Sequence, residues 1–386
     1  MLLIAAVPAL IWLYLLLAHG DFWRISRHFT PAPAQRDLAR KIVAIIPARD
    51  EAALIGDTVN SLLRQEFAGS VHVIVIDDGS ADGTGVAALD EAARLGASAA
   101  LTVIHGAPVP PGWSGKVWAM AQGVEAAAAL DPDYLLFTDA DIHHDADNVA
   151  ALVTLAEAHH RDLVSYMVRL STTSFAERCL IPAFVFFFFS LYPPAWIASP
   201  RRRTAGAAGG CILIRPQALA RSGGLQSIRS QIIDDCALAR AIKAAGGSLW
   251  LGLTRTARST RPYGTFSQIG RMISRTAFNQ LHHSYWLLAA TMLGLFCTYL
   301  LPALLLLSGQ PAPVALGAAA WALMSIGYAP MIRFYGLSPL WSVCLPAIAV
   351  FYAAATLCSA LQYRLGRGGS WKGRVQDVRG KPILPR

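Results

Sequence analysis

Apolar positions in this chain occur in two kinds of segment. From residue 41 to about residue 258, short β-branched apolar runs alternate with amphipathic stretches that are rich in Ala and Leu. This rhythm predicts a largely parallel sheet covered by helices. The clearest strands are KIVAIIPA, VHVIVIDD and DYLLFTDAD, because each runs apolar and then ends abruptly in polar residues. Ligands of such sheets bind at the carboxyl ends of the strands, so these polar residues are the first place to look for chemistry.

Long apolar segments flank this region on both sides. Residues 1–18 carry no charge, which is close to the roughly 20 apolar residues that a spanning helix needs. Basic residues follow the segment, beginning with Arg24 and Arg27, so we expect an uncleaved anchor at residues 1–20 with its C-terminal end in the cytoplasm. A cleaved signal peptide is the alternative. Residues 286–361 are predicted to hold three further spans, namely Trp286–Leu307, Pro313–Ile332 and Leu340–Leu361.

Two apolar features leave the membrane topology open. Three spans after a cytoplasmic domain would place the basic tail, residues 362–386, outside the cell, against the positive-inside tendency. Either one segment is re-entrant or the tendency fails here. A fourth apolar stretch, Leu180–Ala198, is broken by two prolines and followed by three arginines at 201–203. It is either a core helix or a segment lying in the membrane interface, and we expect the second.

Composition agrees with a membrane protein. The 386 residues are 15% charged, and the mean hydropathy of +0.43 is too high for a wholly soluble chain. The net charge of +9 is compatible with nucleic acid, anionic lipid or phosphorylated ligands. Because the basic residues cluster beside apolar segments, they favour a membrane surface and no nucleic acid. The six cysteines include no C-x-x-C pair, which indicates a reducing compartment without a disulfide framework.

The strongest candidate for chemistry is Asp139-Ala140-Asp141, directly after the strand YLLFT. Mg²⁺ in proteins is typically held by one or two carboxylates together with substrate phosphates. We therefore predict a site for Mg²⁺ or Mn²⁺ that a diphosphate completes. A plain turn or a helix cap is the alternative, because D-x-D triplets are common there. The following His143 and His144 are expected to be exposed to solvent rather than to bind metal.

Two earlier strand ends also carry polar groups. Asp77 and Asp78 precede a glycine, and a carboxylate there can accept hydrogen bonds from a base or a ribose. The segment Pro47–Glu51 reads P-A-R-D-E at the end of the first strand. Helix capping is the alternative at both places. Neither G-x-G-x-x-G nor G-x-x-x-x-G-K-[ST] occurs at these strand ends, which argues against a dinucleotide fold or a P-loop.

Three strand ends bearing P-A-R-D-E, D-D-G-S and D-A-D, in that order, resemble the GT-A fold of family 2 glycosyltransferases. The resemblance implies an α/β fold with a mixed, mostly parallel sheet, in a cytoplasmic domain at about 41–275. It also implies an inverting, metal-dependent glycosyltransferase that uses a nucleotide-sugar donor, with UDP favoured by family habit. Gly115-Lys116 looks like the family's G-K, and Gly209-Gly210-Cys211 looks like its segment facing the acceptor.

Two further motifs extend the resemblance. Asp234-Asp235 is similar to the family's E-D motif, with Asp in place of Glu, and implies that Asp235 is the catalytic base. The segment from Gln268 through Arg271 resembles Q-x-x-R-W, with Met272 where Trp would stand. That departure argues against a processive polysaccharide synthase, which is one alternative function. A non-catalytic membrane scaffold is another, although it would be expected to lose one of the acidic positions.

The order of segments resembles the hopanoid-biosynthesis-associated glycosyltransferases, including the W-K-G-R of Trp371–Arg374 in the tail. It implies a multi-pass protein of the inner (plasma) membrane and a lipid acceptor, such as a hopanoid. The implied site residues follow as one set: catalytic Asp235; donor-binding Pro47, Ala48, Arg49, Glu51, Asp77, Asp78, Lys116 and Asp139; acceptor- or phosphate-binding Asp234, Gln268 and Arg271; and metal-binding Asp139 and Asp141.

Overall fold

The computed structural model describes residues 2–25, 35, 37–366, 370–371 and 374–375. They form two compact units, which we call the sheet unit (His28–Ser171, Trp196–Arg261 and Ser370–Arg386) and the helical unit (Met1–Arg27, Thr172–Ala195 and Pro262–Gly369). Arg27 and most of the basic tail, together with Lys372 and Gly373 of the W-K-G-R motif, lie outside the described residues.

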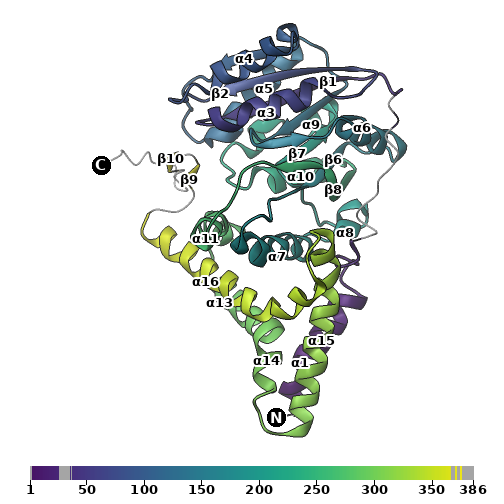
Figure 1. Ribbon diagram of the computed structural model, residues 1–386, viewed down its shortest axis with the longest axis vertical. Helices are drawn as coiled ribbons and strands as arrows, with labels where there is room; N and C mark the ends of the chain where they lie inside the picture. The colour runs from purple at the N-terminus through teal and green to yellow at the C-terminus, as the bar shows by residue number, and fades with distance from the viewer. Residues whose placement is uncertain (1, 26–34, 36, 367–369, 372–373, 376–386) are drawn as a thin grey trace. The chain divides into compact units, whose positions relative to one another are not determined.

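The sheet unit contains an eight-stranded sheet in the order β3-β2-β1-β4-β7-β6-β8-β5 (Figure 1). Strands β3, β2, β1 and β4 run parallel, as do β6 and β8, whereas β7 is antiparallel to both of its neighbours and β5 is antiparallel to β8. This confirms the predicted mixed, mostly parallel sheet. The strands are β1 Lys41–Ala48, β2 Ser70–Asp77, β3 Leu101–His105, β4 Tyr134–Thr138, β5 Ile142–His144, β6 Leu163–Arg169, β7 Cys211–Ile214 and β8 Leu249–Ser259. A separate two-stranded ladder pairs β9 Ser370–Trp371 with β10 Arg374–Val375.

The central strands are apolar on both faces. In β1 every residue after Lys41 is buried, and all of β4 is buried. Such strands read as continuous apolar runs because helices cover both faces of a parallel sheet. The helices and 3₁₀ turns of this unit are α3 Ala52–Leu63, α4 Thr84–Arg94, η1 Ser98–Ala100, α5 Gly115–Ala128, α6 Asn148–Ala158, α9 Pro216–Arg221, η2 Leu225–Ile228 and α10 Asp234–Ala244. Gly123 lets α5 approach β1, because a Cβ at that position would overlap the Ile45 side chain.

The helical unit is built around long apolar helices. Its elements are α1 Leu2–Leu17, α7 Phe175–Leu191, α11 Phe266–Ser274, α12 Ala277–Gln280, α13 Tyr285–Leu295, the π-helix η3 Phe296–Leu300, α14 Leu301–Leu305, α15 Pro311–Phe334, η4 Pro339–Cys344 and α16 Leu345–Arg364. The short helix α8 Pro194–Ala198 crosses the boundary between the units. Helix α1 packs on α15 where Gly327 leaves room, since a Cβ there would lie 2.9 Å from Leu16. The Trp12 indole donates a hydrogen bond of 2.9 Å to the Thr298 carbonyl, and Pro302, four residues after Thr298, has no N–H to donate to it.

Among the described residues, four helical segments are long and apolar enough to cross a membrane: Phe175–Ala198, Tyr285–Leu305, Pro311–Phe334 and Pro339–Arg364. The last three correspond to the predicted spans. The predicted anchor at residues 1–20 forms the shorter helix α1, of 16 residues. The predicted interfacial stretch Leu180–Ala198 falls within the first segment, so by length and composition it is also a candidate span.

The boundary between the units differs from the expected domain limits. The second segment of the sheet unit ends at Arg261, and residues 262–275 belong to the helical unit. The reason is the packing of α11, because Gly270 on this helix lies against Phe351 of α16 and the Phe266 ring lies 6.1 Å from the Phe351 ring. Residues 172–195, which include α7, also group with the helical unit.

Candidate active site

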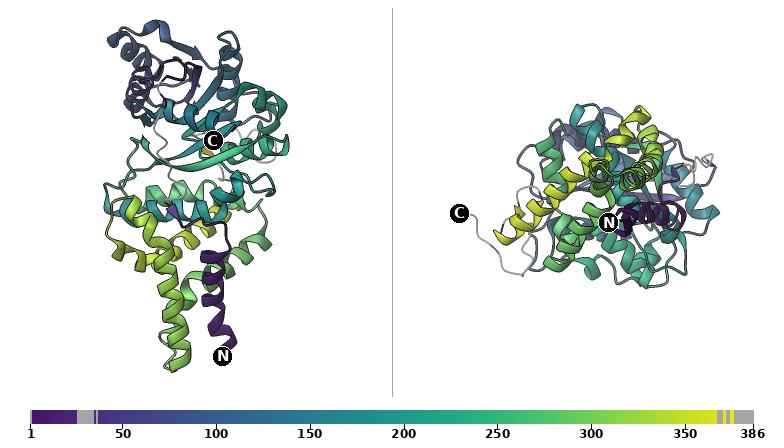
Figure 2. Two further views of the ribbon diagram at one scale, coloured as in Figure 1. Left: turned by 90° about the vertical axis from the view of Figure 1, so that its right-hand side faces the viewer. Right: turned by 90° about the horizontal axis from the view of Figure 1, so that it is seen from below.

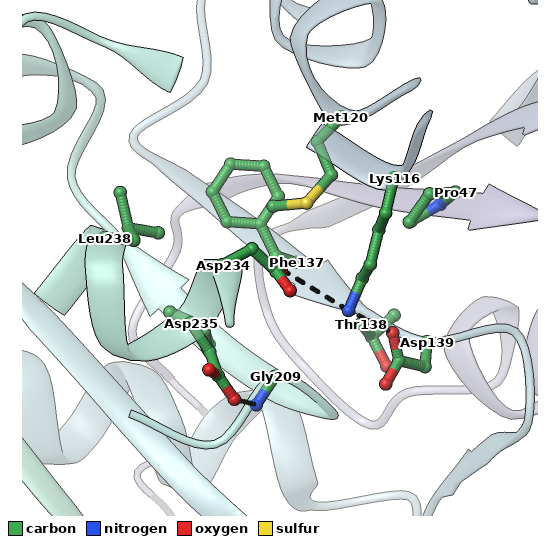
Figure 3. A pocket seen from close by; sticks show the side chains of 11 residues that line it. Pro47, Lys116, Met120, Phe137, Thr138, Asp139, Gly209, Asp234, Asp235 and Leu238 are labelled. Atoms are coloured by element: carbon green, nitrogen blue, oxygen red, sulfur yellow. Dashed lines mark hydrogen bonds and ion pairs between the residues drawn. The ribbon is translucent and has the colours of Figure 1, made fainter. Parts of the chain in front are cut away.

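The sheet unit has a pocket at the carboxyl ends of β1 and β4, beside the first turns of α5 and α10 (Figure 3). The start of β7 lies here as well. Three strand ends and two helix N-termini therefore bring residues from five parts of the chain to one place. The pocket is lined by Pro47, Lys116, Met120, Phe137, Thr138, Asp139, Gly209, Ile212, Asp234, Asp235 and Leu238. Five of these residues are in the predicted site set.

Lys116 lies among three carboxylates. Helix α5 begins at Gly115, with the Ser114 side chain as its N-cap, and the next residue points its ammonium group into the pocket (Figure 3). The Lys116 Nζ lies 2.8 Å from Asp139 Oδ1 and 3.4 Å from Asp234 Oδ2. Burial alone would lower the pKa of Lys116, but Asp139 and Asp234 outweigh it, with a smaller contribution from Asp235, and the pKa is raised. The side chain is a fixed positive charge, suited to binding phosphate.

Asp235 is held by backbone amides. The Gly209 N–H donates to Asp235 Oδ2 at 2.9 Å, and the Cys236 N–H donates to Oδ1 at 2.7 Å. Burial and the neighbouring Asp234 carboxylate raise the pKa of Asp235 to about 6, although Lys116 and the two amides oppose the rise. A general base works best when its pKa lies near the working pH. The residue is thus a carboxylate with a fixed orientation and the basicity that proton removal requires.

Arg261 joins the D-x-D turn to the first strand end. Its Nε lies 2.8 Å from Asp141 Oδ2, and its Nη2 lies 2.6 and 2.5 Å from the two carboxylate oxygens of Glu51. Burial and the charge of Asp139 raise the pKa of Asp141, whereas Arg261 opposes the rise. Sequence reasoning did not single out Arg261, because an arginine after the last strand carries no motif that separates it from its neighbours.

The donor set at the D-x-D turn fits a hard divalent cation. Asp139 and Asp141 follow β4 on one turn, and the mutual repulsion of their charges contributes to the raised pKa of Asp141. A bound cation would relieve that repulsion, and carboxylate oxygens are the ligands that Mg²⁺ and Mn²⁺ prefer. Within the described residues no group of three or more His, Cys, Asp or Glu side chains forms a metal site. The chain supplies two carboxylates, so the remaining ligands would come from a diphosphate and water.

The two aspartates at the end of β2, Asp77 and Asp78, make different contacts. The Asp77 carboxylate accepts hydrogen bonds from the backbone of its own loop, at 2.9 Å from Ser80 N and 3.2 Å from Gly85 N. This is the strand-to-helix turn, and a donor contact of Asp77 stays a prediction. Arg49 donates from Nη1 to the Asp78 carbonyl at 2.5 Å, and its Nη1 lies 3.7 Å from Asp78 Oδ2. The Arg49 Nε is buried, has no hydrogen-bond acceptor among the described residues and lies 3.9 Å from Asp50 Oδ2.

His144 does not lie in solvent as expected. It is 1% exposed, and burial lowers its pKa to about 3. The cause is the pleat of β5, which turns alternate side chains to opposite faces of the sheet. His143 lies on the other face and is half-buried, with Nδ1 3.0 Å from Asp57 Oδ2. Neither histidine belongs to a metal site in the described part of the chain.

The remaining predicted site residues are less central. Ala48 is buried inside β1. Gln268 and Arg271 lie on α11 of the helical unit and do not line the pocket. The Gln268 side chain accepts a hydrogen bond of 3.1 Å from the Thr265 backbone, and Arg271 donates to Ser267 Oγ at 2.7 Å. Their roles in binding acceptor or phosphate stay predictions.

Comparison with known proteins agrees with this geometry. The profile of the family described as Glycosyl transferase family 2 matches residues 43–221. The match covers less than half of the chain, and this region is similar to the family 2 glycosyltransferase domain. Its fold is shared with the mannosyltransferase PcManGT from Pyrobaculum calidifontis, solved in complex with GDP-Man and Mn²⁺. The TM-score is 0.53 at 18% identity, over 94% of this chain and 99% of that one. At this identity the likeness shows the GT-A fold alone.

Among curated proteins, part of the chain is similar to 4,4'-diaponeurosporenoate glycosyltransferases of Staphylococcus aureus. The enzyme of strain bovine RF122 / ET3-1 is 34% identical over 117 residues, which are 30% of this chain and 28% of the relative. The enzyme of strain N315 is 36% identical over 104 residues, which are 27% of this chain and 24% of the relative. The chain thus matches less than a third of the length of these relatives.

Proposed function

We propose that this protein is an inverting glycosyltransferase that moves a sugar from a nucleotide-diphosphate donor to a hydroxyl group of a membrane lipid. The observation that carries the proposal is the pocket of the sheet unit, where Lys116 lies between Asp139 and Asp234 and beside the amide-held Asp235. The pocket offers a cation for a diphosphate, oxygen ligands for a metal and a base for a hydroxyl.

Each group has a defined task in the proposed reaction. Asp235 takes the proton of the acceptor hydroxyl, and the oxygen attacks the anomeric carbon from the face opposite the diphosphate. The new C–O bond forms as the bond to the diphosphate breaks, so the configuration inverts. A general base of this kind contributes roughly 10²- to 10⁴-fold to the rate. Lys116 is placed to bind the departing diphosphate, and Mg²⁺ or Mn²⁺ held by Asp139 and Asp141 would neutralise part of its charge.

At the other end of the donor, Arg49 and Glu51 are proposed to bind the nucleoside, together with the Asp78 carboxylate. The ion pair between Arg49 Nη1 and Asp78 Oδ2, at 3.7 Å, supports this assignment, because it holds both side chains at the strand ends where ligands of such a sheet bind. UDP is the nucleotide that the family resemblance favours. PcManGT, whose fold is similar, is named for a complex with GDP-Man, so the choice between uracil and guanine belongs to the experiment.

A lipid acceptor is proposed on two grounds. Four candidate membrane spans are present in the described residues, so the reaction would take place at a bilayer. The curated relatives are named for transfer to 4,4'-diaponeurosporenoate. The resemblance to hopanoid-associated enzymes makes a hopanoid the first acceptor to test.

We also propose that the sheet unit lies on the cytoplasmic side of the plasma membrane and that α16 does not cross the bilayer. The axis of α16 makes a wide angle with the axis of α15 (Figures 1 and 2). Its C-terminal half packs on α12 and the turn that follows, where the Phe278 N–H donates to Ser359 Oγ at 3.0 Å and the His283 ring stacks on Tyr363 at 4.1 Å. If only α13–α14 and α15 cross after the sheet unit, the basic tail returns to the cytoplasm, as the positive-inside tendency requires.

The test is release of nucleoside diphosphate from a panel of nucleotide sugars by the protein purified in detergent, with Mg²⁺ or Mn²⁺ and a total lipid extract. We expect lipid-dependent release that EDTA abolishes. Asp235→Asn should abolish it as well, whereas Asp90→Asn, which changes an exposed carboxyl on α4, should not. Long glycan products would favour a processive synthase. No release with any donor, and no donor-dependent thermal shift with metal, would favour a scaffold.

A further inference from the structure

A network of buried polar side chains connects β5 to two parts of the pocket, the end of β4 and the Gly209–Gly210 segment. His144 Nδ1 lies 2.9 Å from Asn148 Nδ2, and His144 Nε2 lies 3.0 Å from Thr138 Oγ1. The Thr138 hydroxyl in turn donates to the Gly210 carbonyl at 2.8 Å. His144, Thr138 and Asn148 are all buried, with exposures of 1%, 1% and 0%. Buried hydrogen-bonded networks of this kind fix geometry, because each unpaired member would be costly.

The direction of every proton in this chain follows from the chemistry of its members. Asn148 Oδ1 accepts from Thr256 Oγ1 at 2.8 Å, so Asn148 Nδ2 faces the histidine as a donor. His144 Nδ1 is therefore an acceptor. The neutral ring carries its proton on Nε2 and donates to Thr138, which leaves the Thr138 proton for Gly210. The network has a single consistent arrangement, directed from Asn148 toward Gly210.

The far end of the network meets the site at two points. Thr138 directly precedes Asp139, and Gly210 directly follows Gly209, whose N–H holds Asp235 Oδ2 at 2.9 Å. We propose that His144 is a positioning residue, which through Thr138 locks the Gly209–Gly210 segment against the D-x-D strand and so sets Asp235 relative to Asp139. This inference rests on the proposed function for its catalytic meaning, and on the hydrogen bonds alone for its structural meaning.

Two substitutions separate positioning from simple core packing. In His144→Gln the amide nitrogen can occupy the place of Nε2, so the hydrogen bond to Thr138 is retained and the one from Asn148 is lost. In His144→Asn the amide oxygen can occupy the place of Nδ1, so the bond from Asn148 is retained and the link to Thr138 is lost. Each variant loses one buried hydrogen bond and replaces the ring by a carboxamide, so comparable losses of stability are expected.

Hydrogen exchange of the full-length protein in detergent tests the structural part without reference to activity. In His144→Asn we expect the amides of residues 207–211 to exchange roughly 10-fold faster or more, because Thr138 is no longer held by His144 and its bond to the Gly210 carbonyl is weakened, while α3 and α4 keep wild-type rates. In His144→Gln the same segment should keep nearly wild-type rates. Equal exchange of this segment in both variants, or faster exchange throughout the unit, would overturn the proposal. This readout holds even if no donor is ever turned over.

Steady-state kinetics test the catalytic part. With the active donor, His144→Asn should lose roughly 10- to 100-fold in kcat with little change in the KM for donor, because a misplaced base slows the chemical step. The acid limb of its pH–rate profile should move to higher pH, since a weakened Gly209 N–H bond favours the protonated form of Asp235. His144→Gln should stay within a few-fold of wild type. Equal losses of kcat in both variants, or an unmoved acid limb, would refute positioning, whereas an inactive wild type would refute only the proposed function.

Discussion

If Asp235 is the general base, the pH dependence of the reaction should follow its unusual environment. Burial and Asp234 raise the pKa of Asp235 to about 6, from 3.8 for an ordinary aspartate, while Lys116 opposes the rise. The rate constant kcat/KM should therefore be half-maximal near pH 6 and fall about tenfold for each further pH unit toward acid. An unperturbed carboxylate would keep the reaction at full rate down to about pH 5.

Two variants move this midpoint in opposite directions. Asp234→Asn removes the neighbouring negative charge, so the pKa of Asp235 falls and the acid limb should move to lower pH. Lys116→Met removes the opposing positive charge, so the pKa rises and the limb should move to higher pH. A charge in this range shifts a carboxyl pKa by about one unit or more, so we expect midpoints near pH 5 and near pH 7 respectively.

The assay is nucleoside diphosphate release at subsaturating donor between pH 4 and pH 8, at constant ionic strength, with inactivation checked by returning each sample to pH 7.5. Both residues line the pocket, so their absolute rates should also fall, and the midpoint is the informative quantity. Identical midpoints in wild type, Asp234→Asn and Lys116→Met would refute the assignment of the acid limb to Asp235. Shifts of the same sign would refute the electrostatic reasoning.

Three further predictions concern the glycines of the sheet unit and the membrane topology. Gly209→Ala places a methyl group 3.3 Å from Asp235 Oδ2, so kcat/KM should fall at least about tenfold while the melting temperature changes little. A near wild-type rate would contradict this, because it would show that the pocket accommodates the methyl group. Gly123→Val overlaps Ile45 and should lower the free energy of unfolding by about 1–3 kcal/mol or prevent folding, as measured by denaturant titration. Gly56→Ala on α3 is the mild control, because a Cβ there meets no atom closer than 3.9 Å. If the basic tail is cytoplasmic, added protease should cleave a C-terminal epitope tag in inside-out membrane vesicles and leave it intact in right-side-out vesicles. The reverse pattern would place the tail outside the cell and make α16 a span.

Much of the candidate active site was predictable because its residues lie where strands end. In β1, β2 and β4 an apolar run ends in a short polar segment, and the carboxyl ends of parallel strands meet at one edge of a sheet. The positions of Pro47 and Asp139 at such ends followed from local pattern alone. The family resemblance then added Lys116 and Asp235, which begin helices and carry no local pattern that marks them as neighbours of the D-x-D turn.

The sequence by itself determined the alternation of strands and helices, the polar strand ends and the apolar helices, because each depends on the period and composition of a short segment. Only the tertiary structure decided which groups face each other. Pairing between strands that are distant in the sequence, β4 with β7 and β5 with β8, brings the Gly209 amide, Arg261 and His144 to the site. A strand's register decides which face each side chain takes, and no local pattern reveals the partner. Packing on α16 likewise decided that α11, with Gln268 and Arg271, grouped with the apolar helices of the helical unit rather than with the sheet.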